Sequence, residues 1–179
     1  MFSSKSQLQK RTPENGTDRE NYLSLLVDEY VHSSSFDAKC QVLANLANFA
    51  YDPINFGYIR DVGVLDIFLY VLKKETNDKL LHFAVAGLCN LCSDPLNAAY
   101  IISNSGLRPL TDLLKSDKGD ILADTIVCLH YLYSQENAAA ICSQEVVTRI
   151  CEIQKTNDRR LINLATIFLQ DVCNTKGDT

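Results

Sequence analysis

Two pairs of residues in this sequence have types and spacings that could support chemistry. Cys89 and Cys92 form a Cys-x-x-Cys pair, which could hold a metal ion or exchange a disulfide with a substrate. Cys128 and His130 could form a nucleophile with its general base. The sequence contains no phosphate-binding glycine loop, no His-Glu-x-x-His motif and no nucleophile elbow.

Neither pair is completed into a site by the residues around it. A structural zinc ion needs four ligands, and no second closely spaced Cys or His pair accompanies Cys89 and Cys92. Cys128 and His130 stand two positions apart in a helical pattern, so their side chains do not face each other. We therefore expect buried free cysteines, no metal or other cofactor, no small-molecule substrate and no enzymatic activity.

Amide side chains at helical spacing indicate a different chemistry, the binding of a peptide main chain. Asn48 and Asn90 stand at equivalent places in two similar segments, and residues four and seven positions earlier share a helix face with each of them. Aromatic residues on such a face would anchor a partner, and carboxylates would favour basic partner residues. The predicted partner-binding residues are Gln41, Asn45, Asn48, Phe83, Asn90, Asp124, Tyr131 and Asp171.

An alternative interpretation of these residues stays open. In it, Phe83 belongs to the core, and the asparagines satisfy neighbouring loops of the same chain.

An internal repeat supplies the elements that must position these side chains. The segment 48–55 matches 90–97 at an offset of 42. The leucine that precedes each of these segments recurs at Leu46, Leu88, Leu129 and Leu169, at offsets of 42, 41 and 40. A period of about 40–47 residues is typical of stacked helical units. Only 7 glycines and 4 prolines occur in 179 residues, and 46% of residues are hydrophobic, which weighs against a turn-rich all-β fold.

Capping residues divide each repeat into helices. Asp52 is placed to cap a helix whose first turn holds Pro53, and Asn77 or Asp78 is placed to cap a later one. Glycines 63 and 106 mark breaks between helices. The pattern predicts an all-α fold, a right-handed solenoid of about four three-helix repeats.

The predicted boundaries place a disordered polar tail at 1–19 and the repeat domain at 20–175. Its four units are expected at about 20–51, 52–93, 94–133 and 134–175, and the first lacks its short helix. The last helix carries Ile162, Ile167, Phe168 and Val172, more apolar positions than one packing face needs. We expect a partner to cover part of that surface.

The net charge indicates which classes of partner this protein binds, and the cysteine count indicates the cellular compartment. The net charge is −5, and residues 1–19 carry +2, so the remaining residues carry −7. Such acidity weighs against general nucleic-acid binding. Seven cysteines are an odd number, and no signal-peptide core or run of 18 apolar residues occurs, so we expect a soluble intracellular protein with no disulfide framework and no membrane contact.

The leucine and asparagine signature of the third helix, with a further asparagine past the turn, resembles the armadillo-repeat family. The strings at 41–53, 87–92 and 163–169 are especially similar to a small member of that family, and the resemblance covers about residues 20–173. The family's groove asparagine matches Asn48 and Asn90, whereas Tyr131 and Asp171 occupy its place in the later units. The resemblance implies a nuclear role in pre-mRNA splicing, beside an RNA-recognition-motif protein of the minor spliceosome.

Two functions from different classes follow. The first is a non-enzymatic adaptor that binds another protein inside a ribonucleoprotein, so that any contact with RNA is indirect or minor. The alternative is a helical-repeat protein that binds single-stranded RNA directly, reading about one base per unit. The acidity of the repeat domain favours the first.

Overall fold

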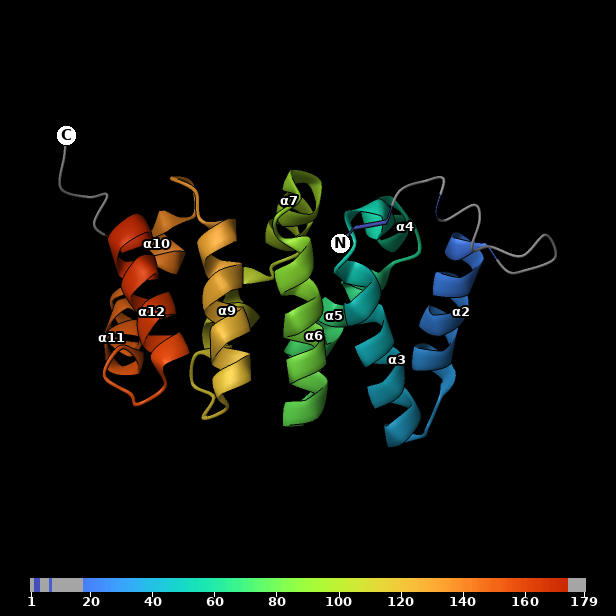
Figure 1. The fold of residues 1–179 in the computed structure, drawn as a ribbon, viewed down its shortest axis with the longest axis horizontal. Helices are drawn as coiled ribbons and strands as arrows, with labels where there is room; N and C mark the ends of the chain where they lie inside the picture. Colours follow the sequence, from blue (N-terminus) through green and yellow to red (C-terminus); the bar gives the residue numbers. More distant parts are fainter. Residues whose placement is uncertain (1, 4–6, 8–17, 174–179) are drawn as a thin grey trace. The chain divides into compact units, whose positions relative to one another are not determined.

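The computed structural model describes residues 2–3, 7 and 18–173, and every regular element in these residues is a helix (Figure 1). The predicted all-α fold is therefore confirmed. The chain divides into two compact units, residues 1–97 and 98–179.

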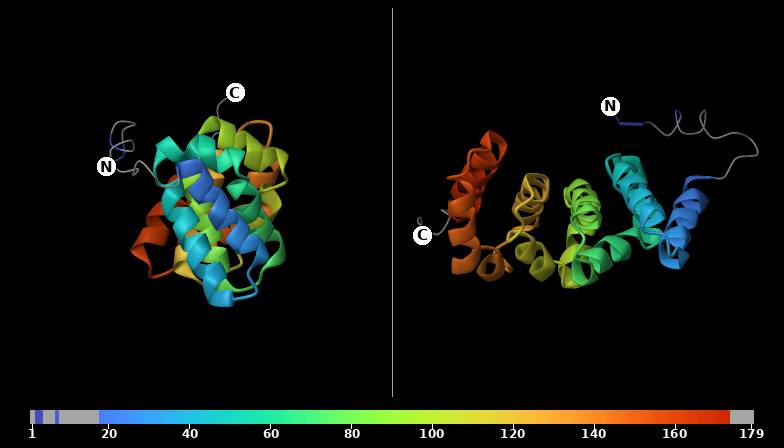
Figure 2. Two further views of the ribbon diagram at one scale, coloured as in Figure 1. Left: turned by 90° about the vertical axis from the view of Figure 1, so that its right-hand side faces the viewer. Right: turned by 90° about the horizontal axis from the view of Figure 1, so that it is seen from below.

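The first unit holds two groups of helices in chain order. The first group is α2 (Arg19–His32) and α3 (Phe36–Ala50). The second begins with the short 3-10 helix η1 (Pro53–Asn55) and continues with α4 (Phe56–Asp61), α5 (Val64–Lys74) and α6 (Asp78–Leu91). Helix α3 packs between α2 and α6, and α5 packs against α6 (Figure 2).

A glycine sets how closely α5 and α6 approach each other. Gly87 is buried in α6, and a methyl group added to it would overlap the ring of Phe68 from α5. Phe68 itself is fully buried. The absence of a side chain at position 87 therefore lets the aromatic ring fill the space between the two helices.

The second unit follows the same order. Helix α7 (Pro95–Ser103) runs across the boundary between the units, and α8 (Leu107–Leu113), α9 (Gly119–Leu132), α10 (Ala138–Ile141), α11 (Gln144–Ile153) and α12 (Arg159–Phe168) follow, ending in a π-helical turn, η2 (Leu169–Cys173). Helix α9 packs against α8 and α12, and α11 packs against α12.

The C-terminal helix buries more of its apolar residues than the sequence pattern suggested. Phe168 is fully buried and Val172 is 2% exposed, whereas Ile167 is 46% exposed. Phe168 and Val172 therefore belong to the packing face of α12 and its π-helical turn, and the surface expected to be covered by a partner is left with Ile167 and the half-buried Ile162.

The expected polar tail lies mostly outside the described residues. Of residues 1–19, the structure describes Phe2, Ser3, Gln7, Asp18 and Arg19. Arg19 is already the first residue of α2, whose N-cap is Asp18.

The first unit contains two joints, the turns that follow α3 and α6, where one repeat ends and the next begins. A buried asparagine forms the main side-chain contacts at each joint. Asn97 is fully buried; its Oδ1 accepts a hydrogen bond of 2.7 Å from Arg60, and its Nδ2 donates to the Leu91 carbonyl at 3.2 Å. Asn55, one repeat earlier, accepts a bond of 2.7 Å from Arg19 and donates one of 2.7 Å to the Phe49 carbonyl. Each asparagine thus joins the C-terminal end of one helix to an arginine from an earlier helix.

The joint in the second unit uses the same amide differently. Asn137 donates to the Leu132 carbonyl at 2.7 Å, but its Oδ1 accepts the backbone N–H of Ser134 at 2.8 Å.

The predicted helix caps in the first unit are confirmed, since Asp52 caps η1 ahead of Pro53 and Asn77 caps α6.

Both predicted helix breaks are confirmed, since Gly63 lies between α4 and α5 and Gly106 between α7 and α8, but only the first has a left-handed glycine. Gly63 has a φ of 80°. At the equivalent place one repeat later the left-handed residue is Ser105, with φ of 57°, and Gly106 has an ordinary φ of −76°. The Ser105 and Gly106 amides donate to the carbonyls of Ile102 and Ile101, which is the Schellman arrangement for ending a helix.

Substitution of Ser105 by glycine should raise the free energy of unfolding by about 0.5 kcal/mol. Glycine removes a left-handed strain of about 1–2 kcal/mol but adds roughly 0.4–1 kcal/mol of unfolded-chain entropy. As a matched control, Ser103→Gly lies in the last turn of α7 and should lower stability by about 0.5 kcal/mol. Urea unfolding measures both, and equal losses for the two variants would contradict the strain at Ser105.

Replacement of Asn97 by alanine should destabilise the protein by about 1–3 kcal/mol, because the buried Leu91 carbonyl and Arg60 each lose a partner. Asn104→Ala, a change of the same type at an exposed position, should stay within about 0.5 kcal/mol of wild type. Thermal unfolding followed by circular dichroism compares the two. Equal melting temperatures would show that the buried amide contributes nothing to the joint.

Candidate functional site

Five of the predicted binding residues lie on the adjacent helices α3 and α6, and we call them the amide surface. Gln41 and Asn48 are exposed on α3, and Asn45 is half-buried there. Phe83 and Asn90 are half-buried on α6. Because α3 and α6 pack together, these side chains belong to neighbouring elements of one compact unit.

One asparagine of this surface is partly used within the fold. The Asn90 side chain donates a hydrogen bond of 3.2 Å to the carbonyl of Ala47 on α3. An asparagine amide offers two donors and an acceptor oxygen, so this bond commits one donor to holding α6 against α3. The alternative interpretation, in which the asparagines serve the chain's own backbone, therefore applies in part to Asn90.

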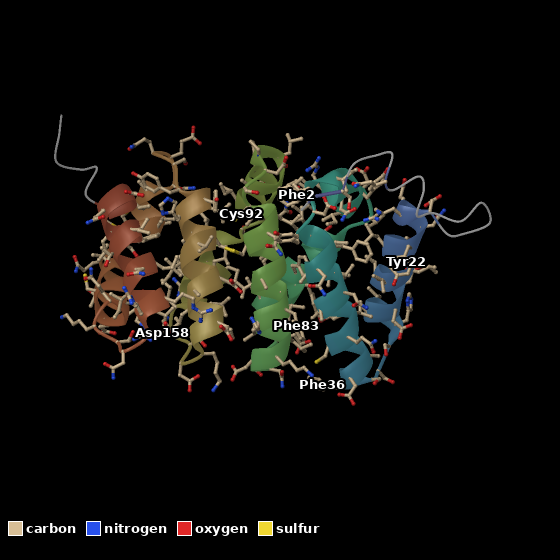
Figure 3. All side chains as sticks on the ribbon, in the orientation of Figure 1. Phe2, Tyr22, Phe36, Phe83, Cys92 and Asp158 are labelled. Atoms are coloured by element: carbon tan, nitrogen blue, oxygen red, sulfur yellow. The ribbon has the colours of Figure 1, made fainter. Side chains whose placement is uncertain are left out.

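Aromatic residues of α2 and α3 continue the first unit beyond Asn48. The rings of Tyr22 and Phe49 lie 5.6 Å apart, and the Arg19 guanidinium lies 5.3 Å from the centre of the Phe49 ring. Tyr22, labelled in Figure 3, lies on α2, and its side chain is 41% exposed. The sequence pattern missed this cluster because the groove positions were assigned only to the third helix of each repeat.

The other three predicted residues belong to the second unit, and we call them the acidic surface. Asp124 is half-buried and Tyr131 exposed on α9, and Asp171 is exposed in η2. Nε2 of His130 lies 3.9 Å from Oδ2 of Asp171, close enough for an ion pair when the imidazole is protonated. The His130 ring also contacts the rings of Tyr131 and Phe168, so it links α9 to the last residue of α12.

An arginine that was not predicted offsets part of this acidity. Arg160 at the start of α12 donates a hydrogen bond of 2.8 Å to Asp120 and lies 3.9 Å from Asp158. The bond to Asp120 raises the pKa of Arg160, and although burial lowers it, the charges of Asp120, Asp158 and Asp124 raise it further. Arg160 stands 40 residues after Asp120, one repeat period later, and that offset is the signal that identifies such a pair.

The two residue pairs with possible chemistry, Cys89 with Cys92 and Cys128 with His130, contact different groups in the structure. The Cys92 thiol donates to the carbonyl of Cys89 at 3.2 Å, near the end of α6 (Figure 3). Cys128 is fully buried, whereas His130 faces Asp171. Among the described residues, no group of three or more His, Cys, Asp or Glu side chains is placed to hold a metal ion.

An open groove of about 790 Å³ lies between α8 and α11 in the second unit. Lys115 crosses it to Glu145 at 3.2 Å, and Arg149 donates to the Leu114 carbonyl at 2.8 Å. Its lining carries three acidic and three basic side chains, Asp112, Glu145, Glu152, Arg108, Lys115 and Arg149, so its charges balance. In the part of the chain that the structure describes, no helix is long and apolar enough to span a lipid bilayer.

Comparison with known proteins shows that this chain is similar in sequence to a curated armadillo-repeat protein. Armadillo repeat-containing protein 7 of Mus musculus is 41% identical over 158 residues, which is 87% of this chain and 79% of the relative. No protein-family model matches the sequence.

Solved structures of designed armadillo repeat proteins share the fold. A computationally designed set for modular peptide recognition superposes with a TM-score of 0.75 at 17% identity, over 92% of this chain and 67% of the designed one. A designed armadillo repeat protein in complex with the peptide (KR)4 gives 0.72 at 16% identity, over 83% of this chain and 63% of that one. Two designed armadillo repeat proteins are longer, and this chain spans 63% of the length of each.

Asn48 and Asn90 should respond differently to alanine. Asn90→Ala removes the bond to Ala47 and should cost about 1 kcal/mol of stability. Asn48→Ala, at an exposed position, should change stability by less than about 0.5 kcal/mol. Chemical unfolding of the two variants measures the difference, and equal losses would contradict the structural role of Asn90.

Proposed function

Because this chain belongs to the armadillo-repeat protein family, we propose that it is a non-enzymatic adaptor that binds an extended segment of another protein. The observation that carries the proposal is the amide surface. There, α3 presents Gln41 and Asn48 in exposed positions, and the adjacent helix α6 carries the half-buried Phe83.

The chemistry of that surface suits a peptide main chain. A side-chain amide can donate to a carbonyl and accept from an N–H at the same time, so exposed amides at helical spacing can pair with an extended backbone irrespective of its side chains. Phe83 and Tyr22 add aromatic area, which is the type of contact that contributes most to protein interfaces. A designed relative in fold was solved with the peptide (KR)4, which supports peptide binding by this architecture.

The charge of the second unit favours a partner with basic residues. Asp171 is exposed and Asp124 half-exposed on the acidic surface, and residues 98–179 carry 10 acidic and 8 basic side chains, a net charge of −2. Opposite charge on the partner would speed association and set orientation more than it would add affinity. Arg160 limits this attraction near Asp124, so the strongest charge preference is expected near Asp171.

A narrower form of the proposal concerns the complex in which the protein acts. We propose that the partner is an RNA-recognition-motif protein of the minor spliceosome, and that the protein acts in the nucleus in pre-mRNA splicing. The support is the sequence resemblance of residues 20–173 to a small armadillo-repeat protein, together with 41% identity to armadillo repeat-containing protein 7. Contact with RNA is then made by the partner.

Affinity purification of the tagged protein from nuclear extract, followed by mass spectrometry, tests the proposal. The wild-type chain should recover an RNA-recognition-motif protein with spliceosomal components. A Gln41→Ala/Asn48→Ala variant should recover the direct partner at least about tenfold less, which corresponds to a loss of roughly 1.4 kcal/mol. Gln135→Ala/Asn157→Ala changes two amides elsewhere and should leave recovery unchanged.

Two results would count against the proposal. Equal recovery by both double variants would remove the amide surface from the interface. Tight, salt-sensitive binding of the purified protein to single-stranded RNA in a gel shift would favour direct RNA binding instead. Recovery of a complex with no splicing factors would contradict only the narrower form.

A further inference from the structure

Two residues near the start of the chain lie against the C-terminal end of α3. The backbone N–H of Ser3 donates a hydrogen bond of 3.0 Å to Oδ2 of Asp52. The ring of Phe2 lies 5.6 Å from the ring of Tyr51. Figure 3 shows Phe2 at the end of α3 opposite Phe36, its first residue.

The repeat explains why Asp52 accepts this contact. The equivalent carboxylate in the next repeat, Asp94, pairs with Arg60 at 3.0 Å. At the first joint, the guanidinium of Arg19 donates to Oδ1 of Asn55 instead. Ser3 therefore contributes to Asp52 the donor that Arg60 contributes to Asp94.

The carboxylate is held in its charged form by these neighbours. Burial raises the pKa of Asp52, but the hydroxyl and backbone of Ser3, the Ile54 N–H and the charge of Arg19 together lower it below its usual value. The backbone N–H of Ser3 donates to Oδ2 of Asp52, and the Ser3 hydroxyl also lowers the pKa of that carboxyl.

The aromatic half of the contact leaves both rings accessible. Phe2 and Tyr51 are each 59% exposed, so the tilted ring pair covers only part of each surface. Such a contact is small enough to exchange with an equivalent segment from another molecule. Tyr51 follows Asn48 by three positions, and its N–H bonds the Asn48 carbonyl at 3.3 Å, so the contact borders the amide surface.

We propose that Tyr51 and Asp52 form a docking site for a short segment in which an aromatic residue is followed by serine, and that Phe2 and Ser3 of this chain occupy it. Tyr51 selects the aromatic ring, and Asp52 selects a residue that offers a backbone N–H together with a hydroxyl. Proline after the aromatic residue is excluded because it has no N–H. The site stands on its own contacts and does not depend on the proposed function.

A labelled peptide of residues 1–7, Met-Phe-Ser-Ser-Lys-Ser-Gln, is the probe for the site. The receptor is the full chain with Phe2→Ala and Ser3→Pro, which empties the site by removing the ring and both donors. Fluorescence anisotropy should show saturable binding to this receptor, and binding at least tenfold weaker to the wild-type chain, whose site is already occupied. A probe with proline in place of its first serine is the matched control and should not bind.

Two further receptors locate the bound peptide. Adding Asp52→Asn or Tyr51→Ala to the emptied chain should weaken binding at least tenfold, while circular dichroism melting shows that each variant remains folded. Binding that is equal with and without Asp52→Asn would overturn the proposal, as would the absence of binding to the emptied chain.

The contact within one molecule has an independent measurement. In the ¹⁵N-labelled full chain, Ser3→Pro should shift the amide resonances of Tyr51 and Asp52 relative to wild type, because it removes the N–H that donates to Asp52. Unchanged Tyr51 and Asp52 resonances in the Ser3 variant would also overturn the proposal. A concentration-dependent dimer that Asp52→Asn abolishes would support it, because the segment of one copy would then occupy the site of another.

Discussion

Buried asparagine amides at the repeat joints donate a second hydrogen bond to helix-end carbonyls, which also accept a backbone N–H from the turn that follows. The last carbonyls of α3 and α6 have no partner within their own helices. Asn55 and Asn97 each donate one N–H to such a carbonyl and use their oxygens to hold Arg19 and Arg60. A single side chain therefore ends one helix and sets the position of an arginine that stands 36 or 37 residues earlier in the chain.

The same constraint determines which surfaces the first unit can present. With the joints closed, α3 and α6 pack against each other along their length, and Asn90 adds a bond between them at Ala47. The outward positions of α3, including Gln41 and Asn48, then remain available to solvent. Helices α3 and α6 therefore use some positions to pack against each other and neighbouring positions to form the amide surface.

Much of the fold could be predicted because its signals are local or periodic. Asp52 and Asn77 cap the helices that their side-chain chemistry favours, and the recurrence of similar segments marks the repeats. The left-handed conformation of Ser105 could not be predicted, because glycine is the usual residue in that conformation and Gly106 stands next to it. The two hydrogen bonds of the Schellman arrangement determine that Ser105 takes the left-handed position. The π-helical turn that buries Val172 has no sequence signature of its own.

The candidate site was less predictable because side-chain partners depend on tertiary contacts. Asn90 and Asn48 look equivalent in sequence, yet it is Asn90 that reaches a carbonyl of the neighbouring helix. Arg160 offsets an acidic residue that stands one repeat period earlier, and Tyr22 joins Phe49 across two helices. The Arg160–Asp120 pair becomes visible only when residues one period apart are compared side by side.

The contact between Gly87 and Phe68 has a consequence for how such sequences can vary. The two positions share one volume, because the ring occupies the place where a side chain at position 87 would lie. A larger residue at 87 is compatible with this packing only if a smaller one stands at 68. Across divergent relatives the two positions should therefore change together, as a coupled pair whose combined size stays constant while its individual members drift.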